Sequence, residues 1–516
     1  MKGPIIILTG LLLVQCASGP RHELDQAVRI PAVPKIDPDY SDLRIPCNIA
    51  PMNFKIIESG SRFVIRISGR HGRPLEIVSN DGIADIPEKG WKRLLKANSD
   101  DTLTMTVFAR HSDVWMQYKP IKNIVASDPI DAYLTYRLIN PAYNLWNEMG
   151  IYQRHLESFI ETPILVNQAI DGSCMNCHHP NPQHPENTMM HIRAGRASGT
   201  FITWNGQSMK VNTATDFNRA GAYASWHPDG DLIAYSVNSL MIFFHTIGEC
   251  RDVVDEKSDL IVYDIARKQV TTCPSISDPE RMETFPCWSP DGRALYFASA
   301  PKIDDFFVMK AGREDLAYNR IRYDLNRISY DPGTGKWGAL ETLYSGEAHH
   351  LSAVQPRVSP DNRFLLFTAC DYGSFPIYLK NADLMLLDLK TGKVTLPAIN
   401  SDQTESHHAW SSNSRWVVFS SKRRDGLLAR PYFSYADENG TFSKPFVLPQ
   451  KDPDFYDRFL KTYNVPELSP QPAPASDREI IRVMNNNDRK INAGLDPDVI
   501  RRLPEKKQAD KATAPG

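Results

Sequence analysis

The chain has 516 residues, enough for a large repeat domain beside a small one, or for two or three separate cores. Its hydrophobic content of 41% and charged content of 23% are those of an ordinary globular protein and exclude disorder over most of the length. A net charge of −2 gives no electrostatic reason to expect a nucleic acid or an anionic membrane as partner, and 28 glycines with 38 prolines favour short turns over long helices.

An export signal is predicted at residues 1–16. A basic residue precedes an apolar run over 5–14, which is typical of a secretory signal and shorter than a membrane span of about 20 residues. Cys16 follows this run, and the segment resembles a bacterial lipoprotein signal, in which that cysteine is lipidated. Gln15 departs from the small residue usual before the cysteine, so ordinary peptidase cleavage stays open. We therefore expect an exported protein, periplasmic or anchored by lipid in the outer membrane.

The next two segments are predicted to be a linker and a small domain. Residues 17–45 are polar and proline-rich, as expected of a linker. Over 46–127, apolar and polar residues alternate in short runs such as 63–67 and 103–108, the period of strands with one buried face. This segment predicts a small β-sandwich domain with one helical insertion near residues 91–97.

A unit of strand, tight turn and apolar strand occurs four times in the second half of the chain. Proline presets the backbone of the turn, and glycine or asparagine accepts its left-handed position. A second hairpin follows the first, and four strands per unit are typical of the blades of a β-propeller. The four turns are centred on Asp229, Asp291, Asp361 and Asn413, at spacings of 62, 70 and 52 residues.

These units resemble the TolB-type propeller, whose repeat centres on Ser-Pro-Asp-Gly after an aromatic residue, as at residues 288–292. The resemblance implies about six blades, of which two are degenerate: one around residues 132–154 and one around the cysteine motif described next. We therefore predict an all-β fold with a TolB-like β-propeller over 128–470. A charged, proline-rich tail over 471–516, extended and with a short helix, is expected to follow it.

The sequence Cys174-x-x-Cys177-His178 has the spacing of a c-type haem attachment site. Two thiols at this spacing can add to the two vinyl groups of haem, and the adjacent imidazole can reach the iron. Haem c is attached outside the cytoplasm, in agreement with the predicted export. The motif therefore predicts haem c, with His178 as the proximal ligand.

Three other interpretations of the two cysteines stay open. They could form a redox pair or a plain disulfide. They could also belong to a structural zinc site, completed by two of the histidines that follow. Those histidines are His179, His184 and His191.

The motif and its surroundings are also similar to a family of exported bacterial TolB-like propeller (lipo)proteins that carry a single Cys-x-x-Cys-His. In that family a His-x-Arg follows the haem motif, and His191-Ile192-Arg193 matches it here. The resemblance implies a haem-binding loop over 171–198 and favours His191 as the sixth iron ligand, ahead of Met190 and then Met189. Packing of the two methionines against a haem or in the core is an equal alternative.

The haem motif can also be aligned with the propeller repeat. Laying residues 176–181 on residues 224–229 places the haem at the innermost hairpin turn of a degenerate blade, at one end of the central channel. In the register of the clear repeats, His407 and His408 are expected on an innermost strand facing the channel. Such residues could bind a metal or a substrate, although polar channel residues are more often simply solvated or hydrogen-bonded.

Other titratable residues are weaker candidates. Glu283 and Glu405 share the repeat register, and His349 and His350 precede another inner strand. No Gly-x-Ser-x-Gly, His-Glu-x-x-His or phosphate-binding glycine loop is present, so a hydrolase or nucleotide-dependent enzyme has no local support. Among the remaining cysteines, Cys250 and Cys273 are as expected to form a disulfide as to stay unpaired, and Cys287 is predicted to be buried.

Three functions follow from these patterns. The first is a membrane-anchored monohaem c-type cytochrome, whose propeller docks a redox or scaffold protein of the cell envelope and whose haem passes single electrons. The second is a propeller that binds a protein or glycan, with a structural or sensory haem. The third is a haem or metal enzyme that uses the propeller channel as its substrate pocket.

Overall fold

The computed structural model describes residues 21–140, 148–193, 195–243, 252–303, 307–310 and 313–502. The predicted export signal, Cys16 and Cys250 lie outside the described residues, and so does the predicted pairing of Cys250 with Cys273. Within these ranges, no helix has the length and apolar character needed to cross a membrane.

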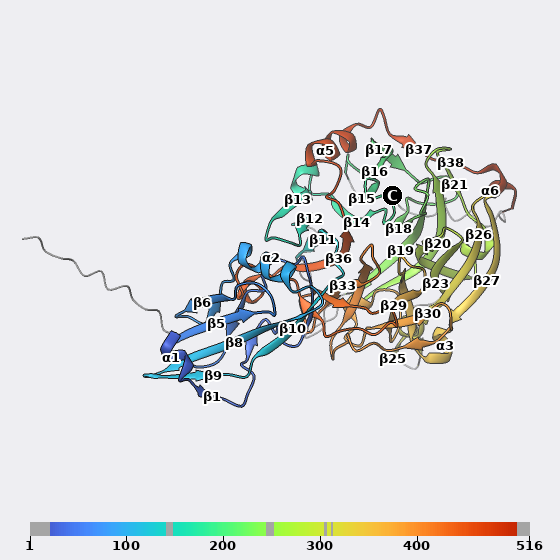
Figure 1. Ribbon diagram of the computed structural model, residues 1–516. Helices are drawn as coiled ribbons and strands as arrows, with labels where there is room; N and C mark the ends of the chain where they lie inside the picture. The colour runs from blue at the N-terminus through green and yellow to red at the C-terminus, as the bar shows by residue number, and fades with distance from the viewer. Residues whose placement is uncertain are drawn as a thin grey trace, which may run out of the picture.

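The N-terminal domain packs a seven-stranded sheet, a three-stranded sheet and one helix around a shared apolar core (Figure 1). The alternating runs at 63–67 and 103–108 form paired antiparallel strands, because each buries one face. The helix α2 (Glu88–Ala97) lies at the predicted insertion. The strands are β1 (Val28–Arg29), β2 (Ile36–Asp37), β3 (Arg44–Pro46), β4 (Phe54–Ile56), β5 (Arg62–Ser68), β6 (Leu75–Ser79), β7 (Ile83–Ala84), β8 (Thr102–His111), β9 (Val114–Gln117) and β10 (Ile121–Ala126).

The predicted linker over 17–45 instead supplies part of this domain. It contains the short helix α1 (Arg21–Asp25) and three strands: β1 pairs with β9, β2 with β4, and β3 with β10. Each of these strands is two or three residues long, too short to show an alternating pattern in the sequence.

The rest of the chain forms a six-bladed β-propeller, which confirms the predicted all-β fold and blade number (Figure 1). One strand of each blade contacts its counterparts in the two neighbouring blades, and these six inner strands close a ring around the channel. The first blade is completed from the far end of the chain, since its inner strand is β36 (Thr462–Ser469). Its other strands are β11 (Tyr133–Ile139), β12 (Met149–His155) and β13 (Glu161–Val166).

The remaining blades follow in chain order, each from its inner strand outward. Blade 2 has β14 (Cys174–Pro180), β15 (Thr188–Arg193), β16 (Gly199–Trp204) and β17 (Gln207–Asn212). Blade 3 has β18 (Ala222–Trp226), β19 (Leu232–Phe243), β20 (Asp252–Asp264) and β21 (Gln269–Thr271). Blade 4 has β22 (Arg281–Trp288), β23 (Ala294–Pro301), β26 (Asp324–Asp331) and β27 (Lys336–Tyr344), with a separate hairpin of β24 (Phe307–Lys310) and β25 (Arg313–Leu316). Blade 5 has β28 (Ser352–Val358), β29 (Phe364–Cys370), β30 (Asp383–Asp388) and β31 (Val394–Thr395). Blade 6 has β32 (Glu405–Trp410), β33 (Trp416–Ser421), β34 (Arg430–Tyr435) and β35 (Phe446–Val447).

The tail after the propeller is docked along its length as far as residue 502. The amphipathic helix α5 (Asp477–Asn485) packs on blades 1 and 2 and buries Ile480 and Met484. Two short strands, β37 (Ile491–Asn492) and β38 (Gly494–Leu495), then add in parallel to the outer edges of blades 2 and 3. The tail is therefore extended with a short helix, as predicted, but it is anchored to the propeller.

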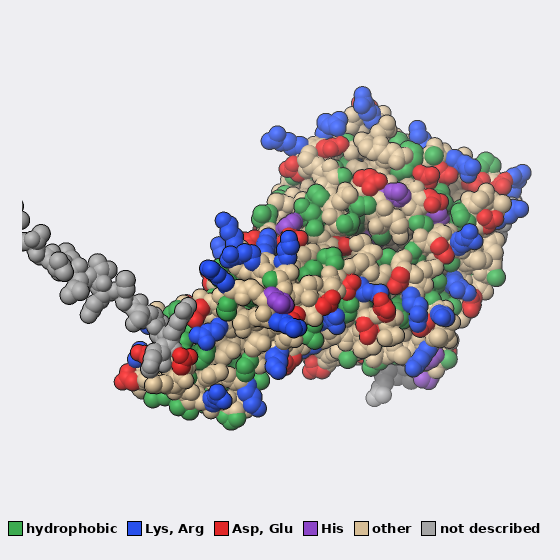
Figure 2. All heavy atoms as spheres, in the orientation of Figure 1, with side chains coloured by type: hydrophobic (Ala, Val, Ile, Leu, Met, Phe, Trp, Pro, Cys, Tyr) green, Lys and Arg blue, Asp and Glu red, His purple; other side chains and the backbone are tan. Residues whose placement is uncertain are grey.

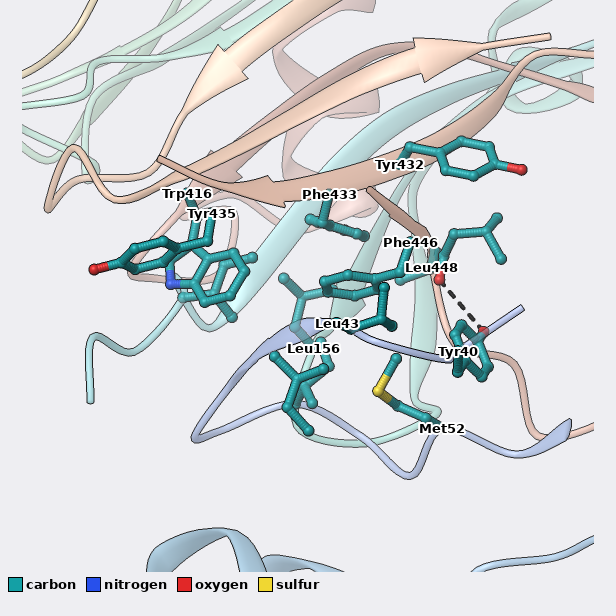
Figure 3. Packing of buried hydrophobic residues seen from close by; sticks show 14 of the residues in the cluster. Tyr40, Leu43, Met52, Leu156, Trp416, Tyr432, Phe433, Tyr435, Phe446 and Leu448 are labelled. Atoms are coloured by element: carbon teal, nitrogen blue, oxygen red, sulfur yellow. Dashed lines mark hydrogen bonds between the residues drawn. The ribbon is translucent and has the colours of Figure 1, made fainter. Parts of the chain in front are cut away.

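The N-terminal domain and blade 6 share one apolar core (Figure 3). Tyr40, Leu43 and Met52 of the domain lie against blade 6, and the hydroxyl of Tyr40 donates a hydrogen bond to the carbonyl of Val447 at 3.3 Å. The blade 6 side chains drawn in this cluster are Trp416, Tyr432, Phe433, Tyr435, Phe446 and Leu448. On the outer surface, Figure 2 shows acidic and basic side chains interspersed over the visible face, in keeping with the net charge of −2.

Candidate functional site

All six inner strands carry a β-bulge at the same position, where two residues lie opposite one residue of the neighbouring strand. In five blades the first bulged residue has a left-handed backbone although it is not glycine, a conformation that costs on the order of 1 kcal/mol or more. These five residues all line one hollow in the channel. They are Tyr223, Phe285, Gln355, His407 and Val465, with φ between 44° and 56°.

The haem motif supplies the sixth bulge. In β14 the register shifts between Asn176 and His179, so Cys177 and His178 occupy the bulge. Cys177 is therefore equivalent to Tyr223, and not to Ser225 as the sequence alignment predicted, so that alignment was wrong by two residues. The motif lies on an inner strand, not in the predicted loop or hairpin turn.

The hollow formed by these bulges has an empty volume of about 1300 Å³, including its open mouth. Cys174 and His178 both line it, together with apolar side chains such as Val253 and Phe375. Three arginines, Arg137, Arg193 and Arg357, also line it. Its mixture of apolar walls with a few polar groups is typical of a ligand pocket.

The imidazole of His178 is buried, with the residue 5% exposed. Neither ring nitrogen makes a hydrogen bond of ordinary geometry, although the backbone of Thr135 lies near enough to raise its pKa slightly. Burial lowers the pKa of His178 to about 4, so the ring is neutral at pH 7. A buried polar atom without a partner costs about 1–3 kcal/mol, and such an atom in a pocket wall calls for a ligand. An iron-binding role for His178 fits this position. The side chain of Cys177 lies outside the described residues.

The candidates for the sixth ligand lie on β15, on opposite faces of the blade. Met190 packs toward blade 1 and shares a smaller side pocket with His178. Met189 packs toward blade 3, and His191 points to the same side because alternate residues of a strand share a face. His191 Nδ1 lies 3.0 Å from Thr200 Oγ1, and His191 is absent from the walls of the main hollow. The structure thus brings Met190, but not His191, close to His178, and the choice of His191 stays a prediction.

A charged cluster divides the channel. The residues that directly follow the bulges in blades 2, 5 and 1 are His179, Arg357 and Glu467, and they line both the main hollow and a second hollow of about 810 Å³. Glu467 Oε1 lies 2.9 Å from His179 Nδ1 and 3.3 Å from an Nη atom of Arg357. Burial raises the pKa of Glu467, but His179 and Arg357 outweigh this effect and lower it to about 2.

Four more residues were predicted near the channel: His407, His408, Glu405 and Glu283. His407 and His408 both line the hollow as expected, and His408 Nε2 lies 2.8 Å from the carbonyl oxygen of Leu366. Glu405 is fully buried in a 3.0 Å ion pair with Arg423. Neither it nor the buried Glu283 lines the hollow.

The remaining predictions concern two histidines, one cysteine and a zinc site. His349 ends helix α3 (Gly346–His349) and His350 caps it, and both are exposed. Cys287 is buried as predicted. In the part of the chain that the structure describes, no group of three or more histidine, cysteine or carboxylate side chains could hold a metal ion. His184 is exposed, and its Nδ1 lies 3.3 Å from Glu186.

Sequence reasoning missed Arg137, Gln355 and Glu467 in the walls of the hollow. The sequence does carry a signal for Gln355 and Glu467. Proline follows the first bulged residue in three blades, so the tripeptides around Pro286, Pro356 and Pro466 align with one another and mark the inner strands on which these two residues lie.

Comparisons with known proteins reveal no family. No family model matches the chain, and no curated protein matches it. Among solved structures, the chain is similar to a structure titled "Crystal structure of Nidogen/Laminin Complex", with a TM-score of 0.38, 8% identity and coverage of 66% of this chain and 100% of that one. It is also similar to a mutant of Synechocystis apocarotenoid oxygenase (TM-score 0.36, 10% identity, 84% and 97% covered) and to the Dos1 propeller (0.26, 14%, 47% and 64%). The propeller assignment rests on the strand order of this chain itself.

Proposed function

We propose that the protein is a monohaem c-type cytochrome-like protein of the cell envelope, with a TolB-like propeller as its scaffold. In this proposal Cys174 and Cys177 hold the haem covalently and His178 is the proximal ligand. The observation that carries the proposal is the buried, neutral imidazole of His178, whose two ring nitrogens make no hydrogen bond of ordinary geometry at the wall of a hollow with mixed apolar and polar walls.

The residues of the chain have defined roles in this proposal. The neutral His178 offers a nitrogen lone pair, and the apolar wall around Val253 and Phe375 limits the access of water. A bound haem would supply one-electron redox chemistry. The propeller would dock a redox or scaffold protein, and lipidation of Cys16 would anchor the chain to the membrane.

Covalent haem is the first test. When the full chain is expressed with haem-c maturation machinery, a pyridine haemochrome assay should find one haem per chain. The double variant Cys174→Ala/Cys177→Ala should carry none, whereas the control Cys47→Ala should keep it, because Cys47 lies in the N-terminal domain. Bound zinc without any haemochrome signal would overturn the proposal.

The envelope anchor is tested separately. Cys16→Ser should move the protein from the membrane fraction to the soluble fraction, because the lipidated thiol is lost. A variant that stays with the membrane would show that lipid on Cys16 is not the anchor.

Ligand binding or catalysis in the hollow is a second candidate function. It is favoured by the position of His191, which lies beside Thr200 and faces away from the hollow. An iron with an open sixth position would bind external ligands. A high-spin ferric spectrum that shifts on addition of cyanide would support this candidate, and a low-spin spectrum unaffected by cyanide would exclude it.

A further inference from the structure

The main hollow has an excess of positive charge. Arg137 and Arg357 line it beside a single described carboxylate, Glu467. Glu467 is already engaged by Arg357 and by His179. A partly buried cation is stabilised by a counter-charge, so the wall favours an anionic occupant.

Arg137 is the guanidinium that lacks a counter-ion. It donates to the carbonyl of Met175 at 3.1 Å and to Asn464 Oδ1 at 2.6 Å, both of which are neutral acceptors. Its Nε is buried and has no hydrogen-bond partner. Among the described residues, no carboxylate lies within ion-pair distance of Arg137.

His407 provides a second donor, and Gln355 determines its tautomer. The backbone N–H of His407 donates to Gln355 Oε1 at 3.0 Å, which orients the Gln355 amide. The amide nitrogen then lies 3.2 Å from His407 Nδ1 and must donate to it. Because Nδ1 accepts, the neutral ring carries its proton on Nε2.

Arg137 and His407 line the same hollow. Burial lowers the pKa of His407 to about 3, and the positive charge of Arg137 lowers it further. Both residues line the hollow beside an apolar surface formed by side chains such as Leu240 and Phe375.

We propose that the main hollow binds a carboxylate carried on an apolar body, through the guanidinium of Arg137 and the Nε2–H of His407. This ligand chemistry has two sources: a free small carboxylate, or a propionate of a haem attached at the motif. The site goes beyond the proposed electron-transfer function and does not depend on it, because its donors belong to blades 1 and 6.

The test uses the full-length protein with its haem content measured. Benzoate is titrated by calorimetry, with benzamide as the uncharged control ligand. One benzoate should bind per chain, and Arg137→Gln or His407→Asn should weaken binding at least about tenfold, since each removes a hydrogen-bond donor to a charge. Asparagine tolerates the left-handed backbone at position 407.

Two controls keep the test decisive. Arg327→Gln removes an arginine paired with Glu341 in blade 4 and should leave benzoate binding unchanged. If Arg137→Gln melts early, Arg137→Lys replaces it, because lysine keeps the charge but loses the bidentate fork and should also weaken binding.

The two sources are separated by the haem-free variant Cys174→Ala/Cys177→Ala. Benzoate binding to both forms identifies a free-carboxylate site. Binding to the haem-free form alone identifies the haem propionate as the natural occupant. Absence of binding in both forms, or binding unaffected by Arg137 and His407 variants, would overturn the proposal. If the unaltered chain carries no haem after expression with the maturation machinery but still binds benzoate, only the cytochrome function is refuted.

Discussion

Glu467 lies in the wall between the two hollows, held by His179 and Arg357. Its folded pKa of about 2 is below the ordinary glutamate value, so its charge stabilises the fold above about pH 4.5, and this stabilisation is lost as the pH falls toward 2. We expect Glu467→Gln to lower the free energy of unfolding by about 2–3 kcal/mol at pH 7, because it removes a buried carboxylate that holds both His179 and the partly exposed Arg357. Urea unfolding at pH 7, 4 and 3 should show this difference shrinking with acid.

Glu438→Gln is the matched control for that series. Its carboxylate is 82% exposed and pairs with Arg415 at 3.4 Å, so its removal should change the unfolding free energy by less than about 1 kcal/mol at any of these pH values. Equal effects of the two variants at pH 7 would contradict the role given to Glu467.

Met190 and His191 lead to opposite expectations for the haem spectrum. Because Met190 shares a side pocket with His178 whereas His191 faces blade 3, we expect Met190→Leu to alter the ferric spectrum and His191→Ala to leave it unchanged. Absorption and electron paramagnetic resonance spectra of the two variants measure this. Conversion of a low-spin haem to high spin by His191→Ala would instead support the ligand that the sequence favoured.

At the scale of single residues, the spacing of Cys174, Cys177 and His178 is local, so the sequence alone could pick out this motif, and its haem stays a prediction. The sequence could not identify Arg137 or Glu467, which come from distant parts of the chain. They line the same hollow only because β36 closes blade 1. The orientation of His407 depends on a hydrogen bond from another blade, which no local pattern encodes.

At the scale of elements, α5 ties the tail to the propeller. Met484 is fully buried against blades 1 and 2, and its carbonyl accepts a 2.7 Å hydrogen bond from Lys210 Nζ. We expect Met484→Ala to cost about 2–5 kcal/mol of unfolding free energy, because it leaves a cavity. The exposed neighbour Arg482→Ala should stay within about 0.5 kcal/mol in the same urea titration. Similar values for both variants would show that the tail does not contribute to the core.

The strands were predicted best where their pattern is long. The repeated turns predicted the four clear blades because one residue of each turn takes the left-handed position that the turn requires: Gly230, Gly292, Asn362 and, in the fourth, Ser414. The haem segment was predicted as a loop, since two cysteines and two histidines do not resemble a strand, yet β14 pairs along its whole length with β15. Pairing to a neighbour with a clear pattern overrides the weak local preference.

At the scale of the whole molecule, the N-terminal domain and blade 6 share one apolar core (Figure 3). We expect the protein to melt in a single calorimetric transition, because a large apolar interface couples the two parts. Leu43→Asp should split the melting curve into two transitions by placing a charge in that interface, whereas Val114→Asp, at a position 49% exposed, should not. Two transitions in the unaltered protein would contradict this coupling.

If the chain is exported as proposed, the closure of blade 1 by β36 also sets an order of events during biogenesis. A chain that crosses the membrane from its N-terminus delivers the cysteine motif long before residues 462–469, so the inner wall beside His178 does not yet exist when the thiols first emerge. An enzyme that modifies those thiols would meet an open half-ring, and the late strand would seal its product inside. Closure of the propeller would then mark the end of a maturation period, after which the modification could no longer be made or easily undone.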